Sequence, residues 1–274
     1  MTAHARRVSS QFPLLDLRPS RTTPSLVPPL PPVEIEQREA VRNLRAALDP
    51  AIARKVSSAT ELIYALNQRR RDEFLPTTIE SFDQLLGGGL PRGKVVELVA
   101  RRATGRFSVV MSTLAAATSI GEAAALIDVS DHFDPQIADA AGVDLRRLLW
   151  VRPKTMKQAV MAAEMLTATG FQLVVIDAGL HPVRGRRVPD ATWVRLARSA
   201  EAHGAVLLIS TPYAFTGTTS EAVIHAEKTR VTWSGIRSNS PRVLTSIRSS
   251  FVLDKHRHMR PGATANCELR TANR

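Results

Sequence analysis

The sequence has 274 residues, of which 44% are hydrophobic, and it carries a formal net charge of +12 with an isoelectric point near 11.0. A chain of this size and composition can bury the core of one α/β domain, which excludes a wholly disordered protein. One cysteine excludes an internal disulfide, and no apolar run approaches the roughly 20 residues that cross a bilayer. We therefore expect a cytoplasmic protein that is not embedded in a membrane. Nucleic acid is the first candidate for a polyanionic partner, ahead of an anionic membrane surface or a merely soluble basic surface.

The two ends of the chain differ in composition from its middle. Residues 1–33 are rich in proline among serines and arginines, and we expect this segment to be disordered. Apolar residues at helical spacing predict a small helical segment over residues 34–74. Residues 75–253 are predicted to form the core domain, and the polar, basic residues 254–274 a second disordered tail.

Apolar runs alternate with amphipathic runs through the core domain. Strands are predicted at residues 95–99, 123–130, 148–151, 173–179 and 205–211, with helices between them. This alternation predicts an α/β fold with a mostly parallel sheet and helices on both faces, whose ligands sit at the carboxyl ends of the strands. Beyond Pro212 we expect a helix over residues 221–227, followed by antiparallel edge strands.

The turn after the first strand departs from the pattern of a phosphate-binding loop. In G-x-x-x-x-G-K-[ST], glycines let the backbone wrap phosphates, the lysine reaches the outer phosphates and the hydroxyl holds magnesium. Here Ala100 stands at the first glycine, Gly105 keeps the second and Arg106 replaces the lysine. Phe107 replaces the hydroxyl, so Ser108, one residue later, would have to substitute for it. A phosphate contact by the arginine stays open, but its fork is not the compact ammonium that such loops use.

With these segments placed, the chain resembles the RecA recombinase superfamily. The resemblance lies in three stretches, in family order and spacing over residues 75–211: LPTTIESFDQLLGGGLPRGKVVEL, IDVSDHFDPQIADAAGVDLRRLLWVRP and LVVIDAG. It implies a RecA-like fold of the P-loop NTPase type. Within the superfamily the chain is most similar to the ImuA-type accessory proteins. That resemblance associates it with damage-induced mutagenesis, beside a Y-family polymerase homologue and an error-prone replicative polymerase.

The same resemblance argues against ordinary recombinase chemistry. The position of the catalytic glutamate falls at Ser130, which cannot act as a base, and the glutamine of the strand-end sensor is absent near Thr211. Asp177 matches the Walker B aspartate, although it could equally cap the next turn. We therefore predict no catalytic residues and no hydrolysis. ATP and Mg²⁺ could still be held without turnover, by a degenerate set of residues: Gly105, Arg106, Ser108 and Asp177.

Two groups of arginines are predicted at the ligand edge of the sheet. Arg184, Arg186 and Arg187 lie in one loop, and Arg101 and Arg102 lie in the degenerate phosphate loop. They could track a DNA backbone or meet an acidic partner, and a solvated charge run is the alternative.

The histidines and tryptophans give no pattern that indicates a ligand site. The histidines lack the spacing of metal ligands, so no metal site is predicted among them. Trp150, Trp193 and Trp233 lie within elements that read as core, so we expect no aromatic platform for single strands.

Three functions stay open. The first is a non-hydrolytic RecA-like adaptor in the bacterial DNA-damage (SOS) response. It would support translesion synthesis by binding DNA and either a Y-family polymerase-like mutagenesis subunit or the RecA recombinase. The second is a DNA-dependent ATPase or recombinase that binds ATP and single-stranded DNA, and the third is an SOS-linked inhibitor of cell division. We prefer the first, with a nucleoid-associated location, because it explains both the basic charge and the lost catalytic residues.

Overall fold

The computed structural model describes residues 42, 43, 46, 72–100, 104–179, 188–234 and 243–270. The tail predicted over residues 1–33 and nearly all of the helical segment predicted over 34–74 lie outside the described residues, so those two predictions stay predictions. None of the described helices is both long and apolar enough to span a bilayer.

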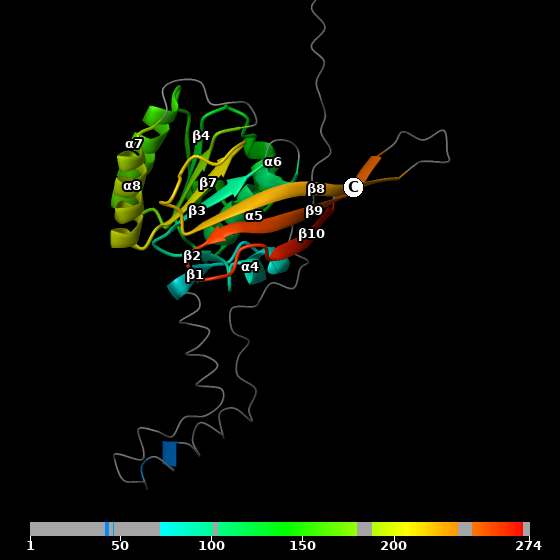
Figure 1. The fold of residues 1–274 in the computed structure, drawn as a ribbon, viewed down its shortest axis with the longest axis horizontal. Coiled ribbons are helices and arrows are strands. Elements are labelled where there is room, and N and C mark those ends of the chain that lie inside the picture. The colour runs from blue at the N-terminus through cyan, green and yellow to red at the C-terminus, as the bar shows by residue number, and fades with distance from the viewer. Residues whose placement is uncertain are drawn as a thin grey trace, which may run out of the picture.

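Strands and helices alternate through the first two thirds of the described chain, and three strands follow (Figure 1). The first elements are β1 (Phe74–Leu75), α4 (Glu80–Leu85), β2 (Leu90–Pro91), β3 (Val95–Val99), α5 (Arg106–Ser119), β4 (Ala124–Asp128), α6 (Pro135–Ala140) and η1 (Leu145–Arg147). The remaining elements are β5 (Leu148–Val151), α7 (Met156–Ala168), β6 (Leu173–Asp177), α8 (Asp190–His203), β7 (Val206–Thr211), β8 (Ala222–Ser234), β9 (Val243–His256) and β10 (Thr264–Arg270).

Eight strands form one sheet, in the order β10-β9-β8-β3-β7-β6-β4-β5. The run from β8 to β5 is parallel, whereas β9 and β10 are antiparallel additions at one edge. Parallel strands need long connections between them, and α5, α7 and α8 lie in the connections from β3 to β4, from β5 to β6 and from β6 to β7. The predicted α/β fold with a mostly parallel sheet is confirmed.

Helices cover both faces of the parallel part of the sheet (Figure 1). On one face α4 and α5 pack against alternate strand residues such as Val96 and Leu98. On the other face α7 and α8 pack against residues such as Ile127 and Ile176. Burying each such aliphatic side chain is worth roughly 1.5–3 kcal/mol, so the two layers fix the helices firmly on the sheet.

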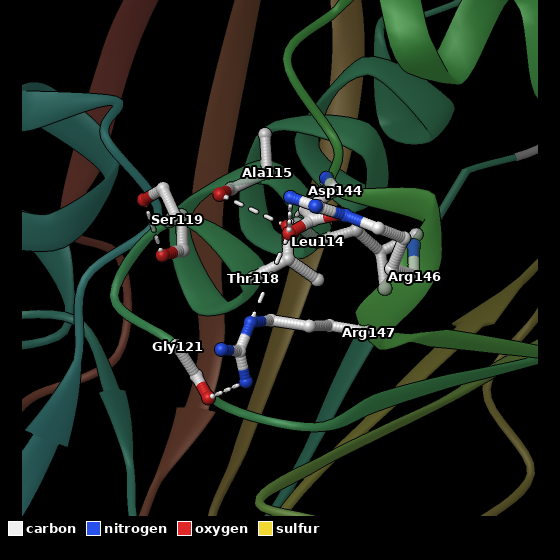
Figure 2. A network of polar contacts seen from close by, with 9 residues as sticks. Leu114, Ala115, Thr118, Ser119, Gly121, Asp144, Arg146 and Arg147 are labelled. Atoms are coloured by element: carbon white, nitrogen blue, oxygen red, sulfur yellow. Dashed lines mark hydrogen bonds and ion pairs between the residues drawn. The ribbon is translucent and has the colours of Figure 1, made fainter.

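A polar network anchors the C-terminal end of α5 to the segment that leads into β5 (Figure 2). The Thr118 hydroxyl donates to the Leu114 carbonyl at 2.8 Å and accepts from the Asp144 amide at 3.0 Å. Arg147 donates to the Gly121 carbonyl at 2.6 Å and lies 3.8 Å from the Asp144 carboxylate. With this end held, the N-terminal end of α5 has a fixed place at the opposite edge of the sheet.

Two predictions for the last third of the chain are wrong. The helix expected over residues 221–227 is part of β8, because Ala222–His225 pairs with β3 and satisfies backbone groups along a buried edge. The tail expected over residues 254–274 is largely ordered, since β9 runs to His256 and β10 pairs with it. Alternate residues of β10, including Ala265 and Cys267, are buried in the core, which explains why this polar stretch is a strand.

Candidate functional site

The carboxyl ends of β4 and β6 meet the N-terminal end of α5. Asp128 and Asp177 are the last residues of their strands, lie opposite each other in register and are both buried. Gly105 precedes α5 with φ of 86°, a left-handed conformation that glycine adopts without strain, and the helix then starts at Arg106. The fold therefore brings Gly105, Arg106 and Asp177 together, and Ser108 lies buried in the first turns of α5.

Arg106 turns inward rather than toward solvent. Its side chain is only 4% exposed, and its Nη2 donates to the Gly179 carbonyl and lies 3.6 Å from the Asp177 Oδ1 atom. The Ser210 hydroxyl donates to the same carboxylate oxygen at 2.7 Å. The residues matched to the P-loop lysine and to the Walker B aspartate thus form a buried ion pair with each other.

Burial acts on the two charges in opposite directions. It raises the pKa of Asp177, an effect that the charge of Arg106 and the Ser210 hydrogen bond oppose and that neighbouring Asp128 reinforces. Burial lowers the pKa of Arg106, and the charge of Asp177 opposes that shift. Burial therefore disfavours the charged form of each partner while the charge of the other opposes this, and the loss of either one would leave the other uncompensated.

Several donors at this site have no partner among the described residues. The Nε and Nη1 atoms of Arg106 and the Thr104 hydroxyl are buried without a hydrogen bond there. The first turn of α5 has no side-chain cap. Helix N-termini and unpaired guanidinium donors both suit an oxyanion, so the arrangement is compatible with one phosphate group.

The same residues do not fit a magnesium ion. Asp177 is engaged by Arg106 and Ser210, and both oxygens of Asp128 accept backbone amides, from Ser130 at 3.2 Å and Phe133 at 2.8 Å. Mg²⁺ demands a near-octahedral set of oxygen ligands. Among the described residues no group of three or more histidine, cysteine or acidic side chains could hold a metal. Both strand-end carboxylates are therefore already engaged by protein donors, and the unpartnered donors can still contact a phosphate.

The residues matched to the other catalytic positions are tied to the backbone. The Ser130 hydroxyl donates to the Ala178 carbonyl at 3.2 Å, and the Thr211 hydroxyl donates to the Tyr213 carbonyl at 2.8 Å. Asp131, adjacent to the missing glutamate, lies in an exposed ion pair with Arg152, whose hydrogen bond lowers the pKa of that carboxyl. The hydroxyls of Ser130 and Thr211 and the Asp131 carboxylate are therefore each engaged by another protein group.

The predicted basic edge lies outside the residues that the structure describes. Arg101, Arg102, Arg184, Arg186 and Arg187 lie outside the described residues, so their DNA or partner contacts stay predictions.

The tryptophan prediction is only partly right. Trp193 is buried in the core and Trp150 is half-buried, but Trp233 is 46% exposed. Its strand continues beyond the packed part of the sheet, a property that strand periodicity does not reveal.

Sequence reasoning also missed Glu97, a fully buried carboxylate on β3. It accepts from the Phe215 amide at 2.8 Å and from the Thr216 hydroxyl, and so anchors the crossover that follows β7. Burial raises its pKa. The signal was available in the sequence, because a glutamate inside the apolar run VVELV needs a partner when the strand is buried.

Comparison with known proteins agrees with this geometry. The family described as the RecA N-terminal domain matches residues 43–184, more than half of the chain. The chain belongs to the RecA family. Its relatives include the RecA protein of Saccharopolyspora erythraea, 42% identical over 108 residues, which are 39% of this chain and 31% of that protein. The RecA protein of Clavibacter michiganensis is 34% identical over 139 residues, 50% of this chain and 38% of its own length.

The RecA fold is also found in a solved structure of the RadB recombinase. That structure has a TM-score of 0.53 and 20% identity, and the match covers 70% of this chain and 94% of the RadB chain. At this identity the likeness shows the fold alone. The chain spans about a third of the length of the curated RecA relatives that it matches, so family membership does not carry over their activity.

Proposed function

We propose that this RecA-family chain is a non-hydrolytic accessory protein of the bacterial DNA-damage response. The observation that carries the proposal is the buried ion pair between Arg106 and Asp177. Nucleotide hydrolysis in P-loop folds needs a cation at the phosphates, a bound magnesium ion and a residue that orients water. Here the cation is paired with the protein's own carboxylate, the metal set does not fit, and Ser130 holds a backbone carbonyl.

A RecA-like core without turnover is suited to binding rather than to chemistry. We propose that it presents a surface like that of a recombinase protomer, and so caps or recruits a filament. By its resemblance to ImuA-type proteins, it would bind a Y-family polymerase-like mutagenesis subunit and DNA, and so support translesion synthesis in the cytoplasm at the nucleoid. The net charge of +12 favours a nucleic acid among its ligands.

A DNA-dependent ATPase or recombinase is the second candidate. The unpartnered donors of Arg106 and Thr104 favour it, because they could donate hydrogen bonds to a nucleotide phosphate. In that case ATP would have to rearrange the Arg106 side chain, and the protein would form nucleotide-dependent filaments.

The deciding experiment measures ATP binding and hydrolysis by the purified full chain, with and without single-stranded DNA. The parent is compared with Arg106→Ala and with Arg146→Ala, which removes an exposed arginine far from the site. We expect no turnover from any of the three. DNA-dependent hydrolysis that disappears only in Arg106→Ala would overturn the proposal.

The adaptor role itself is tested by binding to immobilised RecA filaments and to the mutagenesis polymerase subunit. We expect the parent to bind at least one of them. Binding to neither, with filament assembly unchanged in its presence, would reject the accessory role even if no ATP is hydrolysed.

A further inference from the structure

The turn between β9 and β10 is held by a histidine ring. His256 is the last residue of β9, and its Nδ1 atom accepts the backbone N–H groups of His258 at 3.0 Å and of Met259 at 3.2 Å. A side-chain acceptor for the amides of the next residues is typical of asparagine and aspartate turns, and here a ring nitrogen takes the place of the oxygen. An accepting Nδ1 carries no proton, so this turn requires a neutral His256.

One acidic and three basic side chains surround the His256 ring. Glu221, just before β8, is buried, and its carboxylate lies 3.6 Å from Nε2 of His258 and 3.8 Å from Nε of Arg257 in the turn. Lys255 of β9 directs its ammonium to carbonyls of the segment that precedes Glu221. Burial lowers the pKa of His256, the charge of Glu221 opposes this shift and His258 adds to it. These surroundings favour the neutral ring at neutral pH.

Protonation of His256 would reverse the role of its Nδ1 atom. An imidazolium carries hydrogen on both ring nitrogens, so Nδ1 would direct a donor at the two amides that it accepts in the neutral form. The amides of His258 and Met259 would then lose their acceptor, and the turn would have to open for water to replace it. The pH therefore acts on the geometry of this turn through a single atom.

The turn also determines how β10 is held on the core. β10 is the last strand at one edge of the sheet, and it pairs with β9 alone among the described strands (Figure 1). Met259 of the turn packs against the hydrophobic core, and Cys267 of β10 is buried there, with its Sγ 2.9 Å from the Ser81 hydroxyl of α4. Segments with few neighbours open locally before the rest of a protein unfolds. Opening of the turn should therefore loosen β10 and expose Cys267.

We propose that His256 is a pH-sensitive switch of the β9–β10 hairpin, which holds the turn and β10 on the core when neutral and releases them when protonated. A histidine whose pKa is lowered by folding stabilises the fold above its ordinary value of 6.5, and this stability is lost as the pH falls through that value. Release is therefore expected on the acid side. The switch is separate from the buried pair at Arg106 and does not rest on the proposed function.

The test compares the full chain with three variants at about pH 7.5 and about pH 5, on either side of the usual histidine titration. His256→Asn provides an oxygen acceptor in place of Nδ1 and cannot be protonated in this range. His256→Ala removes the acceptor at every pH. His258→Gln is the matched control, because it removes the neighbouring histidine that can pair with Glu221. Circular dichroism confirms that each variant is folded.

Two measurements follow the turn and the strand separately. Hydrogen exchange by NMR gives the protection factors of the His258 and Met259 amides, and comparison of variants at the same pH removes the intrinsic effect of pH on exchange. The rate of reaction with a pyridyl disulfide, which modifies thiols at acid pH, reports the exposure of Cys267, the one cysteine of the chain. This rate is divided by that of a small reference thiol at the same pH.

We expect protection of the two amides in the parent, relative to His256→Asn, to fall about 10- to 100-fold from neutral to acid pH, as for the loss of two neutral hydrogen bonds. His256→Ala should show the low protection at both pH values, and His258→Gln should follow the parent. The Cys267 thiol should react faster wherever the amides lose protection.

Three results would overturn the proposal. An equal response to pH in the parent and in His256→Asn would show that another group is the sensor. A response that disappears in His258→Gln would assign it to the pairing of His258 with Glu221. A Cys267 thiol that stays slow to react in His256→Ala, although the two amides lose protection, would show that the turn opens without release of β10. None of these measurements involves nucleotide or partner binding, so their outcome is separate from that of the proposed function.

Discussion

Removing either Arg106 or Asp177 from their buried ion pair should lower the free energy of unfolding far more than removing both. The Arg106 and Asp177 side chains are almost fully buried and their charged atoms lie 3.6 Å apart. At an effective dielectric constant near 20, the attraction over this distance is about 4–5 kcal/mol before dehydration is counted. Loss of one partner from such pairs costs about 3–5 kcal/mol, because the other charge is left buried and unpaired.

The perturbation is Arg106→Met, a side chain of similar length without charge. It removes the counter-charge of Asp177 and the hydrogen bond to Gly179, and leaves two neighbouring carboxylates, Asp177 and Asp128, in the core. We expect the free energy of unfolding to fall by about 3–5 kcal/mol near neutral pH. Asp177→Asn alone should cost a similar amount. The double variant should lie within about 1–2 kcal/mol of the parent, because no buried charge then remains unpaired.

The pH dependence provides an internal check. Burial already raises the pKa of Asp177, and loss of Arg106 removes a charge that opposes this shift. A raised carboxyl pKa gives stability that is present at low pH and is lost as the pH rises through the folded pKa. The deficit of Arg106→Met should therefore shrink toward acid pH, whereas that of Asp177→Asn should not shrink in the same way.

The assay is urea unfolding followed by circular dichroism, at two pH values for all four proteins. Their free energies of unfolding are comparable if the fitted m-values agree. Losses that add in the double variant would show that the two side chains are not coupled. If Arg106→Met leaves the free energy of unfolding unchanged, the arginine does not form the buried ion pair with Asp177. That result would also remove the main support for the non-hydrolytic function.

Two further predictions concern Asp83, which is next to Thr77, and Gly179, which is next to the buried ion pair. Burial raises the pKa of Asp83 to about 6, so the stability from this group is complete below its ordinary pKa of 3.8 and is lost as the pH rises through about 6. In Asp83→Asn, whose amide oxygen can still accept from Thr77, the urea midpoint should fall less between acid and neutral pH, and an unchanged pH dependence would contradict this. A Cβ on Gly179 would lie 1.9 Å from the Ser130 hydroxyl oxygen at φ of +72°, so Gly179→Ala should destabilise the protein by about 2–4 kcal/mol in thermal unfolding. Ser130→Gly in the same chain should recover part of that loss, and no recovery would mean that backbone strain, not the clash, sets the cost.

Much of the core could be predicted because its signals are local. Apolar runs of about five residues, such as those at β3 and β6, alternate with longer runs of helical spacing, and each run can bury its apolar side chains only in a helix-covered parallel sheet. The replacements at Arg106, Phe107 and Ser130 are also visible without coordinates, since the motif assigns a role to each position. The sequence by itself therefore determined the fold class, whereas the degeneracy of the phosphate loop stays a prediction from the motif.

Other features depended on which segments become neighbours. Residues 221–227 have no strong local preference, and β3 decided their strand conformation by offering a buried edge that needed hydrogen bonds. Its position in an apolar strand predicts Trp233 as a core residue, but the strand continues past its neighbours and leaves the ring 46% exposed. Tertiary packing also decided that the Arg106 side chain points into the core. Asp177 and Gly179 are more than seventy residues away in the chain, and only the close packing of α5 on β6 places their oxygens where a buried guanidinium can be neutralised.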